Sequence, residues 1–283
     1  MLTVLESVKL SADFLEKKGI ESPRLNAELL LAEIMNCKRL DLYLKFDQPL
    51  KETEIIKYRD WISRRGKFEP LQYIIGKVEF YNLLFNVTPD VLIPRPETEI
   101  LIETIVNRFQ GKENLKILDI GVGSGNISVA LAKNLSGCEI TGIDVSEKAV
   151  LVAKENIIAN ECDSKIKLEN IGIENYSANG FLFDIVVSNP PYVSKSEFIT
   201  LQKEIVEYEP SIAVTDSSDG LYFFRTIADI SKDILKKEGC LFMEIGKGQH
   251  DVVRNILVEN CFNNVHFVND LQEIERIAVG EMS

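Results

Sequence analysis

Strand-like and helix-like segments alternate along this chain from about residue 115 onward. Apolar runs of strand length lie near 115–120, 139–143, 166–170, 182–188 and 239–245, with helical patterns between them near 125–135, 147–160, 196–204 and 219–237. Alternation of this kind is typical of parallel sheets, because each return to a parallel strand needs a connection long enough for a helix. The pattern predicts an α/β fold with a doubly wound parallel sheet and right-handed crossovers, ending in an antiparallel pair over 264–268 and 275–279.

The first 75 residues show almost no strand pattern. Helical spacing of apolar residues predicts helices near 3–18, 24–35 and 52–65, the second introduced by Ser22 as N-cap and Pro23 at the first helical position. Residues 77–87 then alternate around a turn at Tyr81-Asn82, which is typical of a hairpin. We therefore expect three parts: a small helical bundle over 1–75, a linking β-hairpin over 76–92 and an α/β domain over 93–283.

The composition argues against several classes of protein. The chain has 283 residues, of which 45% are hydrophobic and 27% charged, and no apolar run approaches the roughly 20 residues that span a bilayer. The amino-terminal residues lack the pattern of a signal peptide. Five scattered cysteines without a CxxC pair argue against a disulfide framework or a zinc site. We expect a cytoplasmic protein with reduced thiols, no metal and no membrane contact.

The charge distribution bears on the choice of partner. The formal net charge is -12, and residues 1–75 are almost neutral, so the acidic excess lies in the predicted α/β domain. Enzymes that act on nucleic acids generally need a basic stripe to neutralise phosphates. The sequence therefore predicts no stable nucleic-acid partner and favours a protein partner.

A glycine-rich segment joins the first predicted strand of the α/β domain to the helix that follows it. Its residues are Gly121, Val122, Gly123, Ser124 and Gly125. Glycines there allow a sharp turn and a close approach to a ligand. The spacing is not the Gly-x-Gly-x-x-Gly of dinucleotide folds. Taken alone, the segment fits a ligand-binding loop and a simple tight turn equally well.

Two further strand ends carry polar residues. The second strand ends in Asp144, whose carboxylate could accept hydrogen bonds from ribose hydroxyls or could belong only to the cap region before Ser146. The fourth ends in the tetrapeptide Asn189-Pro190-Pro191-Tyr192, whose planar amide, rigid prolines and aromatic ring suit a flat, nitrogen-bearing group. Because ligands bind at the carboxyl ends of strands in open α/β sheets, the three ends together indicate methyl transfer from S-adenosylmethionine to a planar amine or amide nitrogen.

The glycine-rich segment, the acid of the second strand and the Asn-Pro-Pro-Tyr box, in this order, resemble the Rossmann-like class I methyltransferases. Further segments narrow the resemblance to the release-factor glutamine methyltransferases, the HemK/PrmC family, over nearly the whole chain. These segments are 24–35, Glu69–Gly76, Glu79-Phe80, Phe85–Val87, Val91–Glu99, Glu209-Pro210, Asp219–Leu221 and Glu244–Gln249.

The resemblance implies transfer of a methyl group from S-adenosyl-L-methionine to the glutamine amide of the Gly-Gly-Gln motif of peptide chain release factors, which modulates translation termination. It implies that residues 121–125 carry the methionine end of the cofactor and Asp144 the ribose. Asn189 and Pro190 would be the catalytic residues, accepting the amide hydrogens, with Asn189 also next to the cofactor and Pro191 and Tyr192 completing the substrate pocket.

The adenine end of the cofactor site departs from the family pattern. The family usually has a polar or acidic residue and an aromatic there, whereas this chain has Asn170-Ile171-Gly172-Ile173. We therefore expect Gly172 to contribute through backbone and apolar contact.

Several alternatives remain open at the level of sequence. An adenine-N6 or guanine-N2 nucleic-acid methyltransferase uses the same box to hold a flipped base, and a non-enzymatic adaptor can keep a degenerate methyltransferase fold. Arg95 and Glu97 either shape the mouth of the pocket or simply begin a helix.

The helical bundle is expected to recognise the release factor, and the protein is expected to be a monomer. Four basic residues of the bundle either contact the partner or form a solvated helix face: Lys17, Lys18, Arg64 and Arg65.

Overall fold

The computed structural model describes residues 2–283 and divides the chain into two compact units. One unit contains the residues up to Lys77 together with Gln202–Tyr208, and the other contains Val78–Leu201 and Glu209–Ser283. The sequence-based boundary at residue 75 lies close to this division. The assignment of 202–208 differs, because the sequence pattern places that segment within the α/β domain.

The helical unit is built around buried apolar side chains that include Leu15, Leu30 and Leu31. Its helices are α1 (Val4–Lys17), α2 (Pro23–Ile34), α3 (Asp41–Leu44), α4 (Glu52–Arg65) and α5 (Leu71–Ile75). Helix α2 begins at Pro23 as expected, but Ser22 has a left-handed backbone with φ of 48° and its side chain does not cap the helix. The Asn26 side-chain amide instead donates to the carbonyl of Ser22.

Two of the four basic residues expected on an exposed face serve the helical unit itself. Arg65 is only 4% exposed, and its guanidinium donates to Asn26 Oδ1 at 2.7 Å and to Glu204 Oε1 at 2.5 Å. Arg64 is paired with Glu69. The expectation of an exposed Arg65 is therefore wrong, since its ion pair holds helix α10 (Lys203–Tyr208) in this unit.

The predicted hairpin is confirmed as β1 (Lys77–Phe80) and β2 (Leu83–Asn86). Tyr81 and Asn82 both have positive φ, 50° and 58°, as a two-residue turn between twisted strands requires. The rings of Phe80 and Phe85 meet edge to face, with centroids 6.0 Å apart, inside the α/β core.

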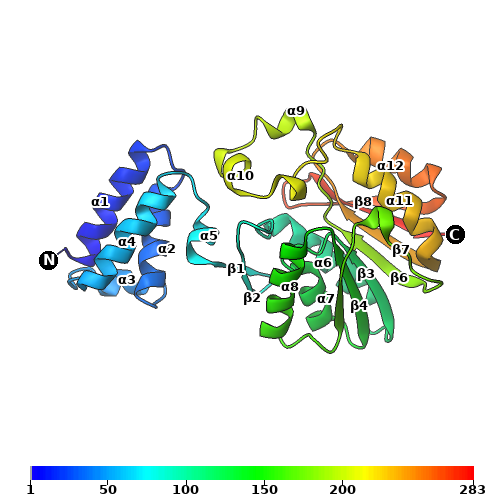
Figure 1. Ribbon diagram of the computed structural model, residues 1–283, viewed down its shortest axis with the longest axis horizontal. Helices are drawn as coiled ribbons and strands as arrows, with labels where there is room; N and C mark the ends of the chain where they lie inside the picture. The colour runs from blue at the N-terminus through cyan, green and yellow to red at the C-terminus, as the bar shows by residue number, and fades with distance from the viewer. Residues whose placement is uncertain (1) are drawn as a thin grey trace. The chain divides into compact units, whose positions relative to one another are not determined.

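The second unit contains a seven-stranded sheet with the order β5-β4-β3-β6-β7-β9-β8 (Figure 1). The first five of these are parallel, whereas β9 is antiparallel to both of its neighbours, so the doubly wound sheet and its terminal antiparallel pair are confirmed. The strands are β3 (Leu115–Ile120), β4 (Cys138–Asp144), β5 (Ile166–Asn170), β6 (Phe183–Ser188), β7 (Leu235–Glu244), β8 (Phe262–Asn269) and β9 (Glu275–Met282).

Helices cover both faces of this sheet (Figure 1). Apolar residues of α6 (Pro96–Phe109), α7 (Asn126–Asn134) and α8 (Glu147–Ala159) pack in one core, and those of α11 (Tyr222–Ile234) and α12 (His250–Glu259) pack in the other. Neighbouring residues of a strand face opposite cores, so Ile117 joins the first and Leu118 the second.

Some connections differ from the sequence-based expectation. Helix α12 was not predicted. The helix expected over 196–204 is replaced by α9 (Lys195–Phe198) and the separate α10, with short 3₁₀ turns at Ile173–Asn175 and Ser211–Ala213. A capping box between Ser194 and Glu197 starts α9. None of the described helices is long and apolar enough to cross a membrane.

Candidate active site

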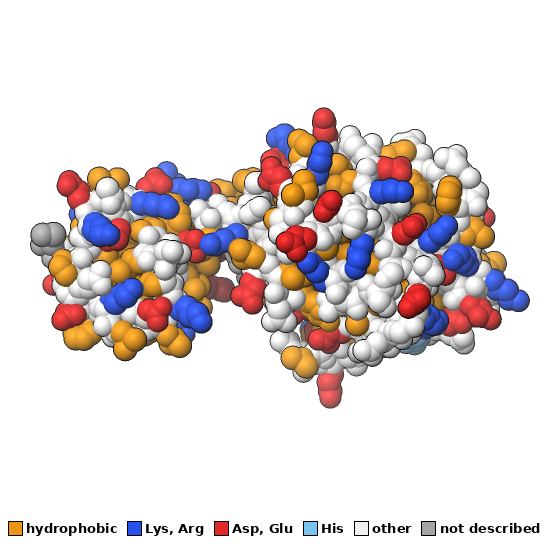
Figure 2. All heavy atoms as spheres, turned by 90° about the horizontal axis from the view of Figure 1, so that it is seen from below, with side chains coloured by type: hydrophobic (Ala, Val, Ile, Leu, Met, Phe, Trp, Pro, Cys, Tyr) orange, Lys and Arg blue, Asp and Glu red, His pale blue; other side chains and the backbone are white. Residues whose placement is uncertain are grey.

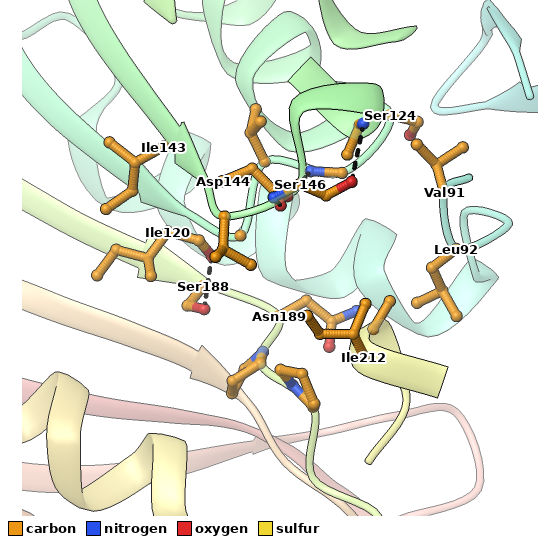
Figure 3. Close-up of a pocket in the computed structure, with 18 of the residues that line it drawn as sticks. Val91, Leu92, Ile120, Ser124, Ile143, Asp144, Ser146, Ser188, Asn189 and Ile212 are labelled. Atoms are coloured by element: carbon orange, nitrogen blue, oxygen red, sulfur yellow. Dashed lines mark hydrogen bonds between the residues drawn. The ribbon is translucent and has the colours of Figure 1, made fainter. Parts of the chain in front are cut away.

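A cavity of about 270 Å³ lies at the carboxyl ends of β3, β4, β5 and β6. This edge of the sheet is where open α/β folds bind ligands, because the connections diverge to opposite faces there. Figure 3 shows Asp144 and Ser146 on one side of the cavity and Asn189 and Ile212 on another. The structure thus brings the three polar strand ends around one space.

The glycine-rich segment forms one wall of this cavity. Gly121 and Gly123 line it with φ of 75° and 53°, a left-handed backbone conformation that residues other than glycine rarely adopt. Val122 and Ser124 line it as well. Gly125 does not: it precedes α7, and an added Cβ would lie 3.4 Å from Ala153 of α8. Gly125 is therefore needed where the loop passes close to a neighbouring helix.

Asp144 lines the cavity and is fixed by backbone donors. Its carboxylate accepts from the N–H of Gly123 and from the N–H of Ser146, both at 2.9 Å. Burial raises the pKa of Asp144, and these two bonds oppose the rise. Ser146 also caps α8 by accepting from the N–H of Ala149. Asp144 therefore belongs to the cap region and faces the cavity at the same time.

A second carboxylate, Asp119, lies in β3 shortly before the glycine-rich segment and outside the lining of the cavity, and the sequence-based assignment missed it. It is fully buried; one oxygen accepts from Ser128 Oγ at 2.6 Å and the other, Oδ1, has no hydrogen-bond partner among the described residues. Burial raises the pKa of Asp119 to about 7. An acidic residue inside the apolar run 115–120 was the signal that could have identified it.

The Asn-Pro-Pro-Tyr box contributes three of its four residues to the cavity wall, namely Asn189, Pro190 and Pro191. Tyr192 lies outside that wall, although the sequence suggested it as part of the pocket. Its hydroxyl donates to Glu244 Oε1 at 3.3 Å, and its carbonyl accepts from the Gln249 amide at 3.0 Å. Tyr192 therefore anchors the box instead of forming the wall.

A chain of hydrogen bonds runs from Asn189 into the protein. Asn189 Nδ2 donates to Thr98 Oγ1 at 3.1 Å, and Thr98 Oγ1 donates to Glu244 Oε2 at 2.6 Å. Thr98 and Glu244 are 1% and 2% exposed, and burial raises the pKa of Glu244 to about 7. Neither was given a role from sequence, although both lie in segments that carry the family resemblance, and Glu244, like Asp119, stands in an apolar strand.

Gly172 lines the cavity together with Ile171, Ile173 and Glu174. An added Cβ at Gly172 would come within 2.9 Å of Glu174 Oε2, so a side chain there would displace that carboxylate. The acidic residue that the sequence lacks at 170–173 is thus supplied one position later, and its other oxygen accepts from the Tyr222 hydroxyl at 3.3 Å.

The two charged residues at the start of α6, Arg95 and Glu97, lie in different places relative to the cavity. Arg95 lines the cavity, and its guanidinium donates to the buried carboxylate of Glu209 at 2.6 Å. Glu97 lies outside the wall, in the first turn of α6. Arg95 therefore fits a place at the pocket mouth, whereas Glu97 fits the helix start.

The residues present suit a cationic nucleoside cofactor. A glycine-lined wall with open space beside Gly121 admits a ligand close to the backbone. Asp144 and Glu174 supply acceptors for hydroxyl and amino groups along the same cavity. Within the described residues, no cluster of His, Cys, Asp and Glu could hold a metal ion.

Two protein-family models match consecutive parts of the chain. Residues 6–76 match the PrmC N-terminal domain, and residues 96–212 match the methyltransferase small domain. The second match spans the glycine-rich segment, Asp144 and the Asn-Pro-Pro-Tyr box.

Full-length relatives are similar along nearly all of the chain. A release factor glutamine methyltransferase of Fusobacterium nucleatum is 38% identical over 277 residues, which cover 96% of this chain and 77% of the relative. One of Geobacter sulfurreducens is 37% identical over 286 residues, covering 99% of this chain and 97% of the relative.

Solved structures with low sequence identity share the fold. The hMettl16 catalytic domain, in complex with the MAT2A 3'UTR hairpin 1, has a TM-score of 0.59 at 15% identity, covering 90% of this chain and 91% of that one. The Thermus thermophilus 16S rRNA N2 G1207 methyltransferase, in complex with AdoMet and guanosine, has a TM-score of 0.52 at 18% identity, covering 73% and 50%. At this identity the likeness concerns the Rossmann-like methyltransferase fold alone.

Proposed function

The chain belongs to the release factor glutamine methyltransferase family, and on that premise we propose that it methylates the side-chain amide of the Gly-Gly-Gln glutamine in peptide chain release factors. The methyl donor is S-adenosyl-L-methionine. The observation that carries the proposal is the pairing of a glycine-lined cofactor wall with Asn189 and Pro190 in one cavity. Neither feature alone would specify an amide substrate.

When bound, S-adenosylmethionine supplies an electrophilic methyl group on a sulfonium. Residues 121–124 would hold its methionine end and Asp144 its ribose, because a carboxylate anchored by two backbone N–H groups keeps lone pairs for hydroxyl donors. Gly172 and Glu174 would border the adenine, where the Glu174 carboxylate can accept from an amino group.

The substrate amide is recognised through its two hydrogens. The side-chain oxygen of Asn189 would accept one, and the carbonyl oxygen of Pro190 the other. A glutamate side chain has no such donors, so it would leave buried acceptors unpaired and would be rejected. Two acceptors at this point thus select a carboxamide.

Catalysis on this scheme is mainly positional. An amide nitrogen is a weak nucleophile because its lone pair is delocalised, and neither His250 nor His266 lines the cavity to act as a base. Holding both hydrogens aligns the nitrogen with the methyl group, and good orientation can supply roughly 7–11 kcal/mol of barrier lowering. Transfer would form the N–C bond as the C–S bond of the sulfonium breaks, leaving S-adenosylhomocysteine, and one amide proton would be lost to solvent.

The charge of the molecule favours a protein substrate over a nucleic acid. The net charge is -12, and basic and acidic side chains are interspersed on the face shown in Figure 2, without a continuous basic stripe. Flipped-base enzymes need the phosphate contacts that such a stripe provides. A base-methylating activity is therefore the weaker candidate.

The test is a methyl-transfer assay with labelled S-adenosylmethionine. The acceptors are a purified release factor, the same factor with its Gly-Gly-Gln glutamine replaced, and bulk DNA and RNA. We expect label on the unaltered release factor only. Label on nucleic acid alone would replace the proposal by the base-methylating one, and no label with retained cofactor binding would favour an adaptor.

A further inference from the structure

The side-chain amide of Asn189 can present either its oxygen or its NH₂ group to the cavity, and only the oxygen suits a substrate that donates. Asn189 follows β6, and two side chains from distant parts of the sequence fix its orientation. They are Thr98, in the first turn of α6, and Glu244, at the end of β7. The links join residues separated by 91 and 146 positions.

We propose that Thr98 and Glu244 are positioning residues that set the orientation of the Asn189 amide and so make the site select a hydrogen-bond donor. The identity of the donor, a glutamine carboxamide, rests on the proposed function. Glu244 lies outside the cavity wall, whereas Thr98 borders the cavity and is assigned its role through its hydrogen bond to Asn189.

The direction of the hydrogen bonds follows from the number of hydrogens available. An ionised Glu244 can only accept, so it takes the single hydroxyl hydrogen of Thr98, over a short 2.6 Å contact typical of a charge-assisted bond. Thr98 Oγ1 then has only lone pairs left for Asn189, which must offer Nδ2. The Asn189 oxygen is thereby turned to the cavity.

Protonation of Glu244 would remove this constraint. A protonated Glu244 can donate to Thr98, which could then donate to the Asn189 oxygen and leave NH₂ facing the substrate. The pKa of Glu244 is raised by burial and by the charge of Glu97, and lowered by Thr98, Tyr192 and Arg276; Arg95 acts on Tyr192. The balance puts the pKa of Glu244 at about 7, so the direction of the hydrogen bonds from Glu244 to Asn189 would change near neutral pH.

The test compares four variants of the full chain: Thr98→Val, Thr98→Ser, Glu244→Gln and, as a control, Thr104→Val. Thr104 lies on the same helix, and its hydroxyl donates to the carbonyl of Ile100. We expect Thr98→Val to lower kcat on a release factor by roughly 10- to 100-fold through misplacement of the amide. Binding of S-adenosylhomocysteine, measured by calorimetry, should stay within about twofold, and Thr98→Ser and Thr104→Val should keep wild-type kcat.

The pH profile separates positioning from a structural role. Wild-type kcat should fall as the pH is lowered through about 7, the pKa of Glu244, and this limb should be absent in Glu244→Gln. Wild-type kcat in Thr98→Val, or an equal loss in Thr104→Val, would overturn the proposal.

A measurement without substrate tests the positioning role of Thr98 and Glu244 independently of the proposed methylation of release factors. In ¹⁵N NMR of the free protein, the Asn189 NH₂ hydrogens should exchange slowly in the wild type and faster in Thr98→Val. If the wild type methylates no release factor, the proposed function fails, and this exchange decides the positioning role alone. Equal exchange in the two proteins would overturn it.

Discussion

The two ends of the cavity are built in different ways. At the cofactor end, two residues that meet are close in sequence: the N–H of Gly123 donates to the side-chain carboxylate of Asp144, 21 positions away, within one βαβ unit. At the substrate end, Asn189 bonds to Thr98 of α6, which bonds in turn to Glu244 at the end of β7. The comparison teaches that one βαβ unit places the glycine-rich segment beside Asp144, whereas only the tertiary structure places Thr98 and Glu244 beside Asn189.

The largest expected effect comes from removing the substrate end altogether. Asn189→Ala should lower methyl transfer by about 10³-fold or more, because both orientation and an acceptor for the amide hydrogen are lost. Cofactor binding should survive, since the other end is untouched. Calorimetry with S-adenosylhomocysteine, alongside the transfer assay, checks both statements; wild-type turnover would remove Asn189 from the catalytic role.

The next largest effect is a dependence of the unfolding free energy on pH, which arises from two buried carboxyl groups, Asp119 and Glu244. Asp119 has a pKa raised by burial from 3.8 to about 7, so its stabilising contribution is complete below pH 4 and is lost as the pH rises to about 7. At 1.36 kcal/mol per pKa unit, the loss is on the order of a few kcal/mol. Glu244 acts in the same direction.

Asp119→Asn should therefore flatten the decline of unfolding free energy between pH 4 and pH 7. Urea unfolding at several pH values measures it. Glu244→Gln should flatten it separately, and an unchanged slope in Asp119→Asn would show that Asp119 keeps an ordinary pKa.

Asp144→Ala should affect the cofactor end alone. Loss of hydrogen bonds from a charged acceptor costs roughly 1.5–3 kcal/mol, which corresponds to a 10- to 100-fold weaker cofactor affinity. At saturating cofactor, kcat should change little, in contrast to Asn189→Ala. Unchanged cofactor affinity would remove the ribose role of Asp144.

The smallest expected effect is a loss of stability on substitution of Gly125, where the glycine-rich segment meets α8. Gly125→Ala should lower stability by about 1–2 kcal/mol through its positive φ, with a further cost from the 3.4 Å approach to Ala153. Gly19→Ala is the matched control, since Gly19 has a similar φ of 79° and no neighbour within 4 Å. Equal losses in thermal unfolding would mean that the helix contact at Gly125 costs nothing.

The same contrast explains what sequence could and could not predict. The sheet, the hairpin and the cofactor loop follow from patterns a few residues long, and their strand ends converge by the general topology of α/β folds. Thr98 and Glu244 lie in segments that resemble the family, but no local pattern gives their role, which depends on the contacts that the fold makes between Thr98, Glu244 and Asn189. Arg65 was misjudged because its partner Glu204 is distant in sequence, and the bond from Tyr192 to Glu244 could not be predicted for the same reason.

The placement of Gln202–Tyr208 with the helical unit has a consequence for modularity. The chain passes from one unit to the other three times, after residues 77, 201 and 208, so no single cut separates them. A truncation at residue 77 would leave Glu204 without Arg65 and Tyr208 without the carbonyl of Lys67. A recombination or fusion that exchanges the amino-terminal region must therefore also exchange the internal segment Gln202–Tyr208. The two units are thus expected to be inherited as one.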